Sequence, residues 1–302
     1  MQKITPNLWF NRNAKEAVDF YISVFKDSTI LNTLNYPTEG LADFQKEFAG
    51  QPVAIDFELM GYRFTAINAG SEFVPNPSIS FIVTIDPARD RDAEAHIKER
   101  WERLSEGGKI LMPFQAYNFS KLYGWVEDRY GISWQLILTD PQGESKPSII
   151  PVLLFVTDEC ESAEAATEFY FSLFKNTKRG KLVRYPKGIG SNKEGSVMFS
   201  DFMLEGQWFV AMDGSTKDHA FKFNEAVSLS IACKDQTEID YYYDKLSHIP
   251  ESEICGWCKD KYGVSWQVVP ENAAALLQKP GAWQNMMNMK KIIIADYEKK
   301  AL

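Results

Sequence analysis

The chain has 302 residues, a formal net charge of -8 at pH 7 and a pI near 5.1. This length predicts about two domains of roughly 150 residues, each large enough to bury a self-sufficient core without added cross-links. The acidic balance argues against a nucleic-acid partner, because phosphate binding needs a concentrated basic field.

Cysteine usage and apolar runs predict the compartment. Four cysteines stand at uneven spacings, namely Cys160, Cys233, Cys255 and Cys258. They are too few for a disulfide framework, and the first residues do not resemble a signal peptide. The longest apolar runs are far shorter than the roughly 20 residues needed to cross a bilayer. We therefore expect a soluble, cytoplasmic protein without a membrane partner.

The first predicted elements alternate in hydrophobic period. Residues 8–10 lie on a short strand, and an apolar stripe at helical spacing follows over residues 14–25. Apolar and polar side chains alternate over residues 53–59, and Gly61 begins a turn that returns the chain as a hairpin. With a further strand near residues 29–36, this stretch makes a β-α-β-β-β unit.

The next stretch repeats this order. It contains a strand at 79–83, a helix at 93–104, and strands at 124–126 and 132–137 around a turn at 128–131. Helical stripes recur later, over residues 163–173 and 239–246. Four such units predict two strongly curved, mostly antiparallel sheets, each a cup with helices outside and a cavity inside.

An internal repeat accounts for this regularity. The segments GWVEDRYGISWQ at 124–135 and GWCKDKYGVSWQ at 256–267 share eight of twelve residues. Three more segment pairs recur in the same order, namely 20–28 with 169–177, 55–64 with 200–209, and 76–85 with 224–233. Because internal repetition decides architecture, we interpret the chain as a tandem duplication.

The duplication predicts an α+β fold with domains at residues 1–143 and 144–302. Each domain is expected to pair two β-α-β-β-β modules in one curved sheet. The first copy is longer near residues 106–122, which we expect to be a connecting loop. The second domain is expected to end in a C-terminal helix carrying a group of lysines, Lys290, Lys291, Lys299 and Lys300.

Long runs in the second half resemble a known family. They are FKFNEAVSLSIACKDQTEIDYYYDKL from Phe221, CGWCKDKYGVSWQVVP from Cys255 and MMNMKKIIIADYEKKAL from Met286. The chain resembles the PhnB-like, "3-demethylubiquinone-9 3-methyltransferase" branch of the vicinal oxygen chelate (glyoxalase/bleomycin-resistance) superfamily. The first half is similar but looser, with Tyr123 where the second half has Cys255. The resemblance implies tandem glyoxalase-like domains that pair as an internal pseudo-dimer, with a homodimer also possible.

The superfamily usually holds a divalent metal with His and Glu side chains on inner strands. The positions that correspond to those ligands carry Thr5 or Pro6, Ile150 or Pro151, Thr65 or Ala66, Val210 or Ala211, Ser78, Ala226, Gln135 and Gln267. One amide oxygen per copy cannot hold a divalent ion against water, because stable sites need three or four good donors. We therefore expect no tightly bound metal and no other cofactor.

Three other features have plain structural interpretations. We expect the histidines to lie at the surface, at His96, His219 and His248. The Gly188–Gly190 turn has no helix behind it, so it predicts a loop rather than the glycine-rich turn of an S-adenosylmethionine site. Cys255 and Cys258 form a C-x-x-C on a predicted strand, and buried structural thiols are favoured over a redox or zinc pair.

The repeated hairpins supply the candidate site residues. Gln135 and Gln267 are expected on the inner face, where ligand contact and a structural hydrogen bond remain equally open. Tryptophans favour core or interface packing, although some could line the cup; they are Trp125, Trp134, Trp257 and Trp266. We take Gln135, Gln267, Trp125 and Trp257 as the candidate ligand-binding residues. Asp128 and Asp260 are expected to stabilise the turn before each final strand.

Two classes of function remain. The first is a small-molecule-binding protein of the bleomycin-resistance kind, without a tightly held metal. The second is an enzyme, namely a lyase, a dioxygenase or the methyltransferase of the family label, that recruits a metal to act on a small oxygenated metabolite. One copy could also have lost its pocket and serve only as the partner of the other.

Overall fold

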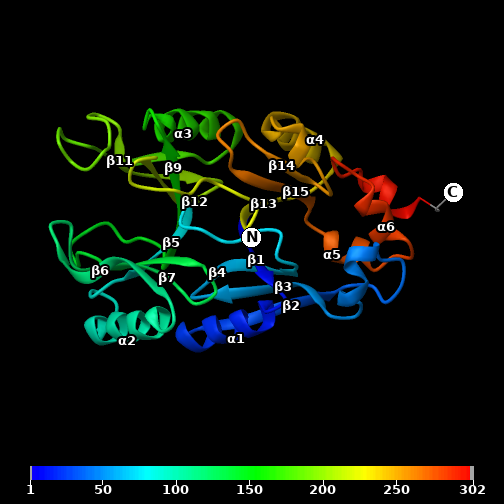
Figure 1. Ribbon diagram of the computed structural model, residues 1–302, viewed down its shortest axis with the longest axis horizontal. Helices are drawn as coiled ribbons and strands as arrows, with labels where there is room; N and C mark the ends of the chain where they lie inside the picture. The colour runs from blue at the N-terminus through cyan, green and yellow to red at the C-terminus, as the bar shows by residue number, and fades with distance from the viewer. Residues whose placement is uncertain (1, 300–302) are drawn as a thin grey trace.

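The computed structural model describes residues 2–299 (Figure 1). The first half of the chain contains, in order, β1 (Ile4–Asn11), α1 (Ala14–Val24), β2 (Ser28–Asn35), η1 (Asp43–Phe48), β3 (Pro52–Leu59), β4 (Tyr62–Ala69), β5 (Ile79–Ile85), α2 (Ala93–Ser105), β6 (Lys109–Tyr117), β7 (Ser120–Glu127) and β8 (Ser133–Leu138). The predicted order of strands and helices is confirmed. The expected loop at 106–122 is wrong, because strand β6 occupies most of it and pairs with β7.

The second half repeats these elements with a shorter final hairpin. Its elements are β9 (Ile149–Thr157), α3 (Ser162–Leu173), β10 (Lys178–Arg184), β11 (Val197–Leu204), β12 (Gln207–Ser215), β13 (Val227–Cys233), α4 (Gln236–Leu246), η2 (Pro250–Ser252), β14 (Trp257–Lys259), β15 (Ser265–Pro270), α5 (Ala273–Leu277), α6 (Ala282–Met287) and η3 (Ile294–Glu298). Within the described residues no helix is long and apolar enough to span a bilayer.

The expected single C-terminal helix is wrong. Three short helices, α5, α6 and η3, follow β15 instead. Helix α5 ends at Leu277, Pro280 cannot continue a helix, and Gly281, with a φ of 76°, caps the start of α6. Lys290 and Lys291 lie between α6 and η3, and Lys299 follows η3. Lys300 lies outside the described residues.

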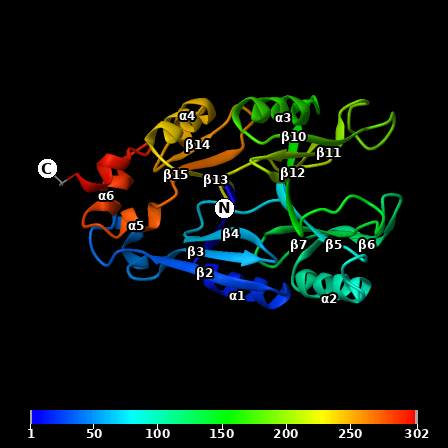
Figure 2. The same ribbon diagram turned by 180° about the vertical axis from the view of Figure 1, so that it is seen from behind.

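The strands form two curved, mostly antiparallel sheets, as expected. Sheet A has the order β14-β15-β13-β1-β4-β3-β2, and sheet B has the order β10-β11-β12-β9-β5-β8-β7-β6. Figures 1 and 2 show α1 and α2 along one side of the molecule and α3 and α4 along the other, with both sheets running between these layers. The α+β fold of paired β-α-β-β-β modules is therefore confirmed.

The modules that share a sheet differ from the expectation. Each sheet joins one module from each half of the chain, through antiparallel pairing of β1 with β13 and of β5 with β9. The opening strand of a module leaves one edge without a partner, and an unpaired edge must be completed by another strand or protected. The sequence pattern shows that each module has such an edge, but not which module covers it.

The hydrophobic core nevertheless joins the two modules of one half. Phe64 on β4 of sheet A meets Phe81 on β5 of sheet B, with ring centroids 5.0 Å apart. In the second half Tyr170 on α3 packs on Trp266 of β15, with centroids 5.6 Å apart. Each half thus packs on itself while its sheets continue into the other half. The division at residues 143 and 144 stays a prediction about which unit folds alone.

Candidate functional site

A buried aspartate network fixes each repeated hairpin. Asp128 accepts hydrogen bonds at Oδ1 from the backbone N–H groups of Tyr130 (2.8 Å) and Ile132 (3.0 Å). Its Oδ2 accepts from the Trp134 indole (2.8 Å) and from the Tyr21 hydroxyl on α1 (2.9 Å). Burial raises the pKa of Asp128 to about 6, although these four hydrogen bonds lower it. The network ties the turn, the last strand and the first helix together.

Asp260 builds the same network in the second half. Its partners are the backbone of Tyr262 and Val264, the indole of Trp266 and the hydroxyl of Tyr170. Burial likewise raises the pKa of Asp260. The predicted turn role of both aspartates is confirmed. Trp134 and Trp266, which are fully buried beside them, are confirmed as core residues.

Gln and Trp side chains project from the other face of each hairpin. Trp125 is paired with Gln135 across β7 and β8, and Trp257 with Gln267 across β14 and β15. Directly paired residues point to the same side of a sheet, and successive residues point to opposite sides. These pairs therefore occupy the inner face, away from the core. The structure brings each Gln to its own Trp and keeps the two pairs in different sheets.

In sheet B the inner-face pair is fully engaged by the protein. Gln135 donates through Nε2 to Ser80 Oγ at 2.9 Å, and its Oε1 accepts from the Tyr123 hydroxyl at 2.8 Å. The Trp125 indole donates to Ser133 Oγ at 2.7 Å. Gln135 is 5% exposed. Its amide is thus occupied at both ends and shielded from solvent.

In sheet A the equivalent pair is only partly engaged. Gln267 donates through Nε2 to Ser228 Oγ at 3.0 Å, but its Oε1 accepts no hydrogen bond from residues 2–299. Cys255 takes the place of Tyr123, so the hydroxyl that would reach Oε1 is missing. The Trp257 indole N–H also donates to no group in the described chain. Both side chains are half-buried.

The centres of the two inner faces differ in polarity. In sheet B, Val152 is paired with Ser80 and with Val210, and both valines are 0% exposed. The same register in sheet A pairs Asn7 with Ser228 and with Thr65. A polar row of Thr65, Asn7 and Ser228 therefore lies in sheet A where sheet B has two buried valines and a serine.

Further side chains complete the inner face of sheet A. Asp56 accepts a hydrogen bond from the Thr65 hydroxyl at 2.7 Å. The Trp9 ring lies edge-on to Trp257, with centroids 6.4 Å apart, and to Phe73, with centroids 5.0 Å apart. A patch of hydroxyls and amides is thus bordered by aromatic rings.

The side chains on this face are poor ligands for the divalent metal that members of the superfamily usually hold. The polar row offers hydroxyl and amide groups, and the nearby Asp56 carboxylate already accepts a bond from Thr65. Tight divalent sites combine imidazole, thiolate or several carboxylate ligands. Across residues 2–299, no three His, Cys, Asp or Glu side chains converge as a possible metal site. We derive no reaction step through a metal.

The remaining sequence candidates lie away from the inner faces. His96 lies on α2 and contacts Asp90 at 2.6 Å, while His219 and His248 lie in loops. The Gly188–Gly190 turn is a loop between β10 and β11. The Gly188–Gly190 loop is confirmed, whereas of the three histidines expected at the surface only His248 is exposed, and His96 and His219 are half-buried.

The C-x-x-C cysteines are buried to different degrees. Cys258 is buried on β14, as predicted, whereas Cys255 is half-buried in the turn before that strand, with a φ of 50°. Burial raises the pKa of the Cys255 thiol to about 11 and also raises that of Cys258. A raised thiol pKa disfavours the thiolate that redox chemistry needs.

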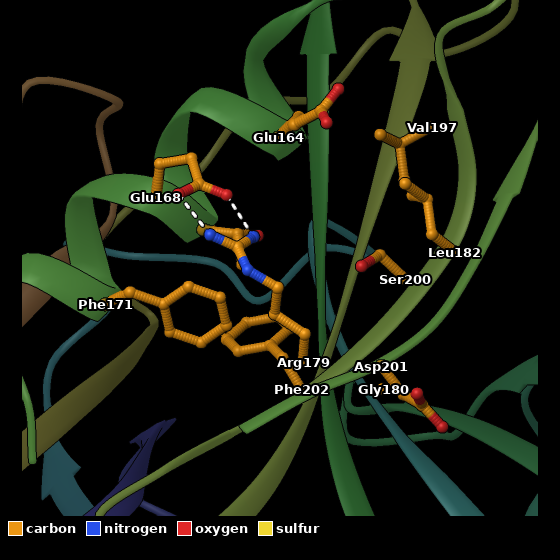
Figure 3. A pocket seen from close by; sticks show the side chains of 11 residues that line it. Glu164, Glu168, Phe171, Arg179, Gly180, Leu182, Val197, Ser200, Asp201 and Phe202 are labelled. Atoms are coloured by element: carbon orange, nitrogen blue, oxygen red, sulfur yellow. Dashed lines mark hydrogen bonds and ion pairs between the residues drawn. The ribbon is translucent and has the colours of Figure 1, made fainter. Parts of the chain in front are cut away.

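Two hollows of the structure lie elsewhere. One, of about 110 Å³, lies between α3 and strands β10 and β11 (Figure 3). The other lies between the end of β2 and the segment that joins α5 to α6. Neither is lined by any of the four candidate ligand-binding residues.

Sequence reasoning missed the polar row itself. Ser80 and Ser228 hold the same place in the aligned segments 76–85 and 224–233, so their identity in both copies was a usable signal. Asn7 and Thr65 carry no such signal, because the aligned positions hold valines. Their importance follows from the order of strands in sheet A.

Comparison with known proteins places the chain in context. The sequence model of the family described as 3-demethylubiquinone-9 3-methyltransferase matches residues 2–137 and 147–269. The PhnB protein of Bacillus cereus is 36% identical over 46% of this chain and 100% of its own, with a TM-score of 0.39. Protein PA1353 from Pseudomonas aeruginosa is 20% identical over 46% of this chain and 98% of its own, with a TM-score of 0.38. Glyoxalase I from Zea mays is 11% identical over 89% of this chain and 94% of its own, with a TM-score of 0.48. No curated protein matches the chain.

Proposed function

Because the chain belongs to the 3-demethylubiquinone-9 3-methyltransferase family of PhnB-like proteins, in the vicinal oxygen chelate superfamily, we propose that it binds a small polar organic molecule on the inner face of sheet A. Sheet B then serves mainly as its structural partner. Binding needs no tightly held metal.

The difference between the two hairpins carries this proposal. Gln267 Oε1 and the Trp257 indole N–H have no protein partner within residues 2–299, whereas both equivalent atoms in sheet B are hydrogen-bonded. These half-buried atoms are reachable by water, and a ligand that offers matching groups can take the place of that water. Gln267 Oε1 can accept from an N–H or O–H group of a ligand, and the Trp257 indole N–H can donate to a carbonyl oxygen or ring nitrogen of the same ligand.

The surroundings suit a compact, flat ligand. Trp9 and Trp257 present aromatic surface beside the polar row, and aromatic walls with a few placed polar groups are typical of small-molecule sites. By contrast, Val152 and Val210 fill the centre of the inner face of sheet B. A polar molecule there would bury its groups against aliphatic side chains without hydrogen bonds, which is unfavourable.

The shared sheets support a second part of the proposal. Each sheet is completed by strands from the other half, so the two halves act as an internal pseudo-dimer. In sheet A the polar row joins Thr65 and Asn7 of the first half to Ser228 of the second, so neither half holds the row alone.

A pair of matched variants tests the ligand site. A library of neutral heteroaromatic amides and alcohols is screened by thermal shift, and the affinity of a hit is then measured by calorimetry. We expect Gln267→Ala to weaken binding by at least about tenfold, which corresponds to the loss of about 1.4 kcal/mol.

Gln135→Ala is the control in the other copy. It should leave ligand affinity unchanged and lower the free energy of unfolding by about 1–3 kcal/mol, because the buried Tyr123 hydroxyl loses its acceptor. The proposal fails if affinity follows Gln135 instead of Gln267.

A further inference from the structure

Helix α3, the edge strand β10 and its neighbour β11 line a partly open cavity of about 110 Å³. It lies on the helix-covered side of sheet B, in the opposite sheet from Gln267. Figure 3 shows Glu168, Arg179 and Phe171 on one wall, with Ser200, Leu182 and Val197 on the other. This space is smaller than the engineered apolar cavity of about 150 Å³ that holds benzene, but it is partly open, so a small ring fits with one edge in solvent.

The first half of the chain fills the corresponding space with side chains. In the aligned repeats Val18 corresponds to Thr167, and Ile55 corresponds to Ser200. Both Val18 and Ile55 are fully buried. Serine is much smaller than isoleucine, so Ser200 leaves space where the first half has Ile55, whereas Thr167 has about the volume of Val18 and adds a hydroxyl group.

The interior of the cavity combines aromatic surface with two hydroxyls. Phe171 and Phe202 meet edge to face, with centroids 5.9 Å apart. The Thr167 hydroxyl donates to the backbone oxygen of Ala163 at 2.8 Å, which leaves its own oxygen able to accept. The Ser200 hydroxyl bonds to no other group of the described chain, so it can donate or accept.

The charges at the mouth of the cavity are paired. Arg179 is hydrogen-bonded to Glu168, and its guanidinium lies 4.6 Å from the centre of the Phe171 ring. Arg184 is paired with Glu164 at 2.8 Å. An ionic ligand would have to break one of these pairs or enter the aromatic interior with its charge unpaired. Both are unfavourable, so the chemistry selects a neutral molecule.

We propose that this cavity is a second binding site, for a small neutral ring compound that carries one hydroxyl or carbonyl group. The ring packs against the Phe171 and Phe202 pair, and its polar group bonds to Ser200 or Thr167. This site does not depend on the ligand proposed for sheet A.

Phenol titration followed by thermal shift and calorimetry tests the site. We expect saturable stabilisation of the full chain by phenol, and at least about tenfold weaker binding of benzoate, which has the same ring and a charge. In the Thr167→Val/Ser200→Ile variant, which restores the side chains of the first half, phenol binding should fall at least about tenfold. The variant should still fold, because its new side chains pack at the equivalent place in the first half.

Two further variants keep the result interpretable. Ser200→Val alone fills less of the cavity and should weaken phenol binding if the double variant fails to fold. Gln267→Ala should leave phenol affinity unchanged, whereas phenol bound at sheet A would respond to it. The proposal is overturned if phenol shows no saturable effect, or if it binds the filled variants as it binds the parent chain.

Discussion

A single residue difference separates the surroundings of the two inner-face glutamines. Tyr123 satisfies the acceptor of Gln135, and Cys255 at the equivalent place cannot reach that of Gln267. The Cys255 thiol donates instead to the sulfur of Met287, at 3.7 Å. The two glutamines stand in nearly identical sequence contexts. The amide oxygen of Gln135 nevertheless accepts a hydrogen bond from the protein, whereas that of Gln267 does not.

The buried aspartates give the stability a definite pH dependence. The pKa of Asp128 is about 6 in the folded chain, above its ordinary value of 3.8, so the folded state binds the proton more tightly. The contribution of Asp128 to the free energy of unfolding is therefore greatest below about pH 4, falls as the pH rises towards about 6, and stays low above. Asp260 adds a contribution of the same sign. Urea unfolding at several pH values across this range measures the slope of the free energy of unfolding against pH.

Asp128→Asn should reduce this slope and also lower stability at pH 7 by about 1–3 kcal/mol. The amide NH₂ would face the Trp134 indole N–H and the Tyr21 hydroxyl, which now both donate. Asp140→Asn is the control, since Asp140 is an exposed residue that accepts one backbone bond from Gln142. An unchanged slope in Asp128→Asn would contradict the assignment.

At the scale of elements, the C-terminal segment replaces a missing strand. Sheet B has β6 beside β7, whereas η2 precedes β14 in sheet A. Backbone N–H groups of Cys255 and Gly256 donate instead to the oxygens of Met289 and Lys290, both at 2.7 Å. The segment then reaches the first half, where Trp283 packs with Tyr36 and Phe48. Figure 1 shows this segment at the end of the molecule beside sheet A.

Trp283→Ala should loosen this segment before the rest of the fold. Trp283 is buried and donates to Gln45 at 3.2 Å, and truncation of a buried Trp costs about 3–5 kcal/mol. We expect faster hydrogen exchange at the amides of Cys255 and Gly256, with the β1 amides unchanged. Phe44→Ala is the control, because Phe44 is exposed on the nearby η1. Equal loss of protection in all strands would show that the segment does not open separately.

At the scale of the molecule, the shared sheets predict that the halves depend on each other. Fragments 1–143 and 144–302 would each keep a helix-covered core but expose the edges of opening strands, which normally pair across the halves. We expect the fragments to associate when mixed, or to self-associate when alone, as measured by sedimentation. Two stable, separate monomers would contradict the pseudo-dimer and favour independent domains.

Metal content tests the binding interpretation of the whole chain. The polar row of sheet A lacks strong ligands for a divalent ion, so the purified protein should carry well under one nickel, manganese or zinc ion, and these ions should not raise its melting temperature. Mass spectrometry and thermal shift measure both quantities. Near-stoichiometric metal with clear stabilisation would favour the metal-recruiting enzyme instead.

Periodicity and repetition in the sequence determined the modules, their order and the turn role of Asp128 and Asp260, because these depend on interactions between residues near in sequence. The sequence pattern did not predict strand β6, although β6 pairs with the adjacent β7, because its pairing has several register shifts and its side chains are mostly exposed, so no regular hydrophobic alternation marks it. The break in the C-terminal helix was not predicted because its residues are held by contacts with the first half of the chain. The tertiary structure alone decided which modules share a sheet. It thereby placed Asn7 and Thr65 beside Ser228. Pairing between strands far apart in sequence depends on complementary edges in space, and no local pattern of residues encodes it.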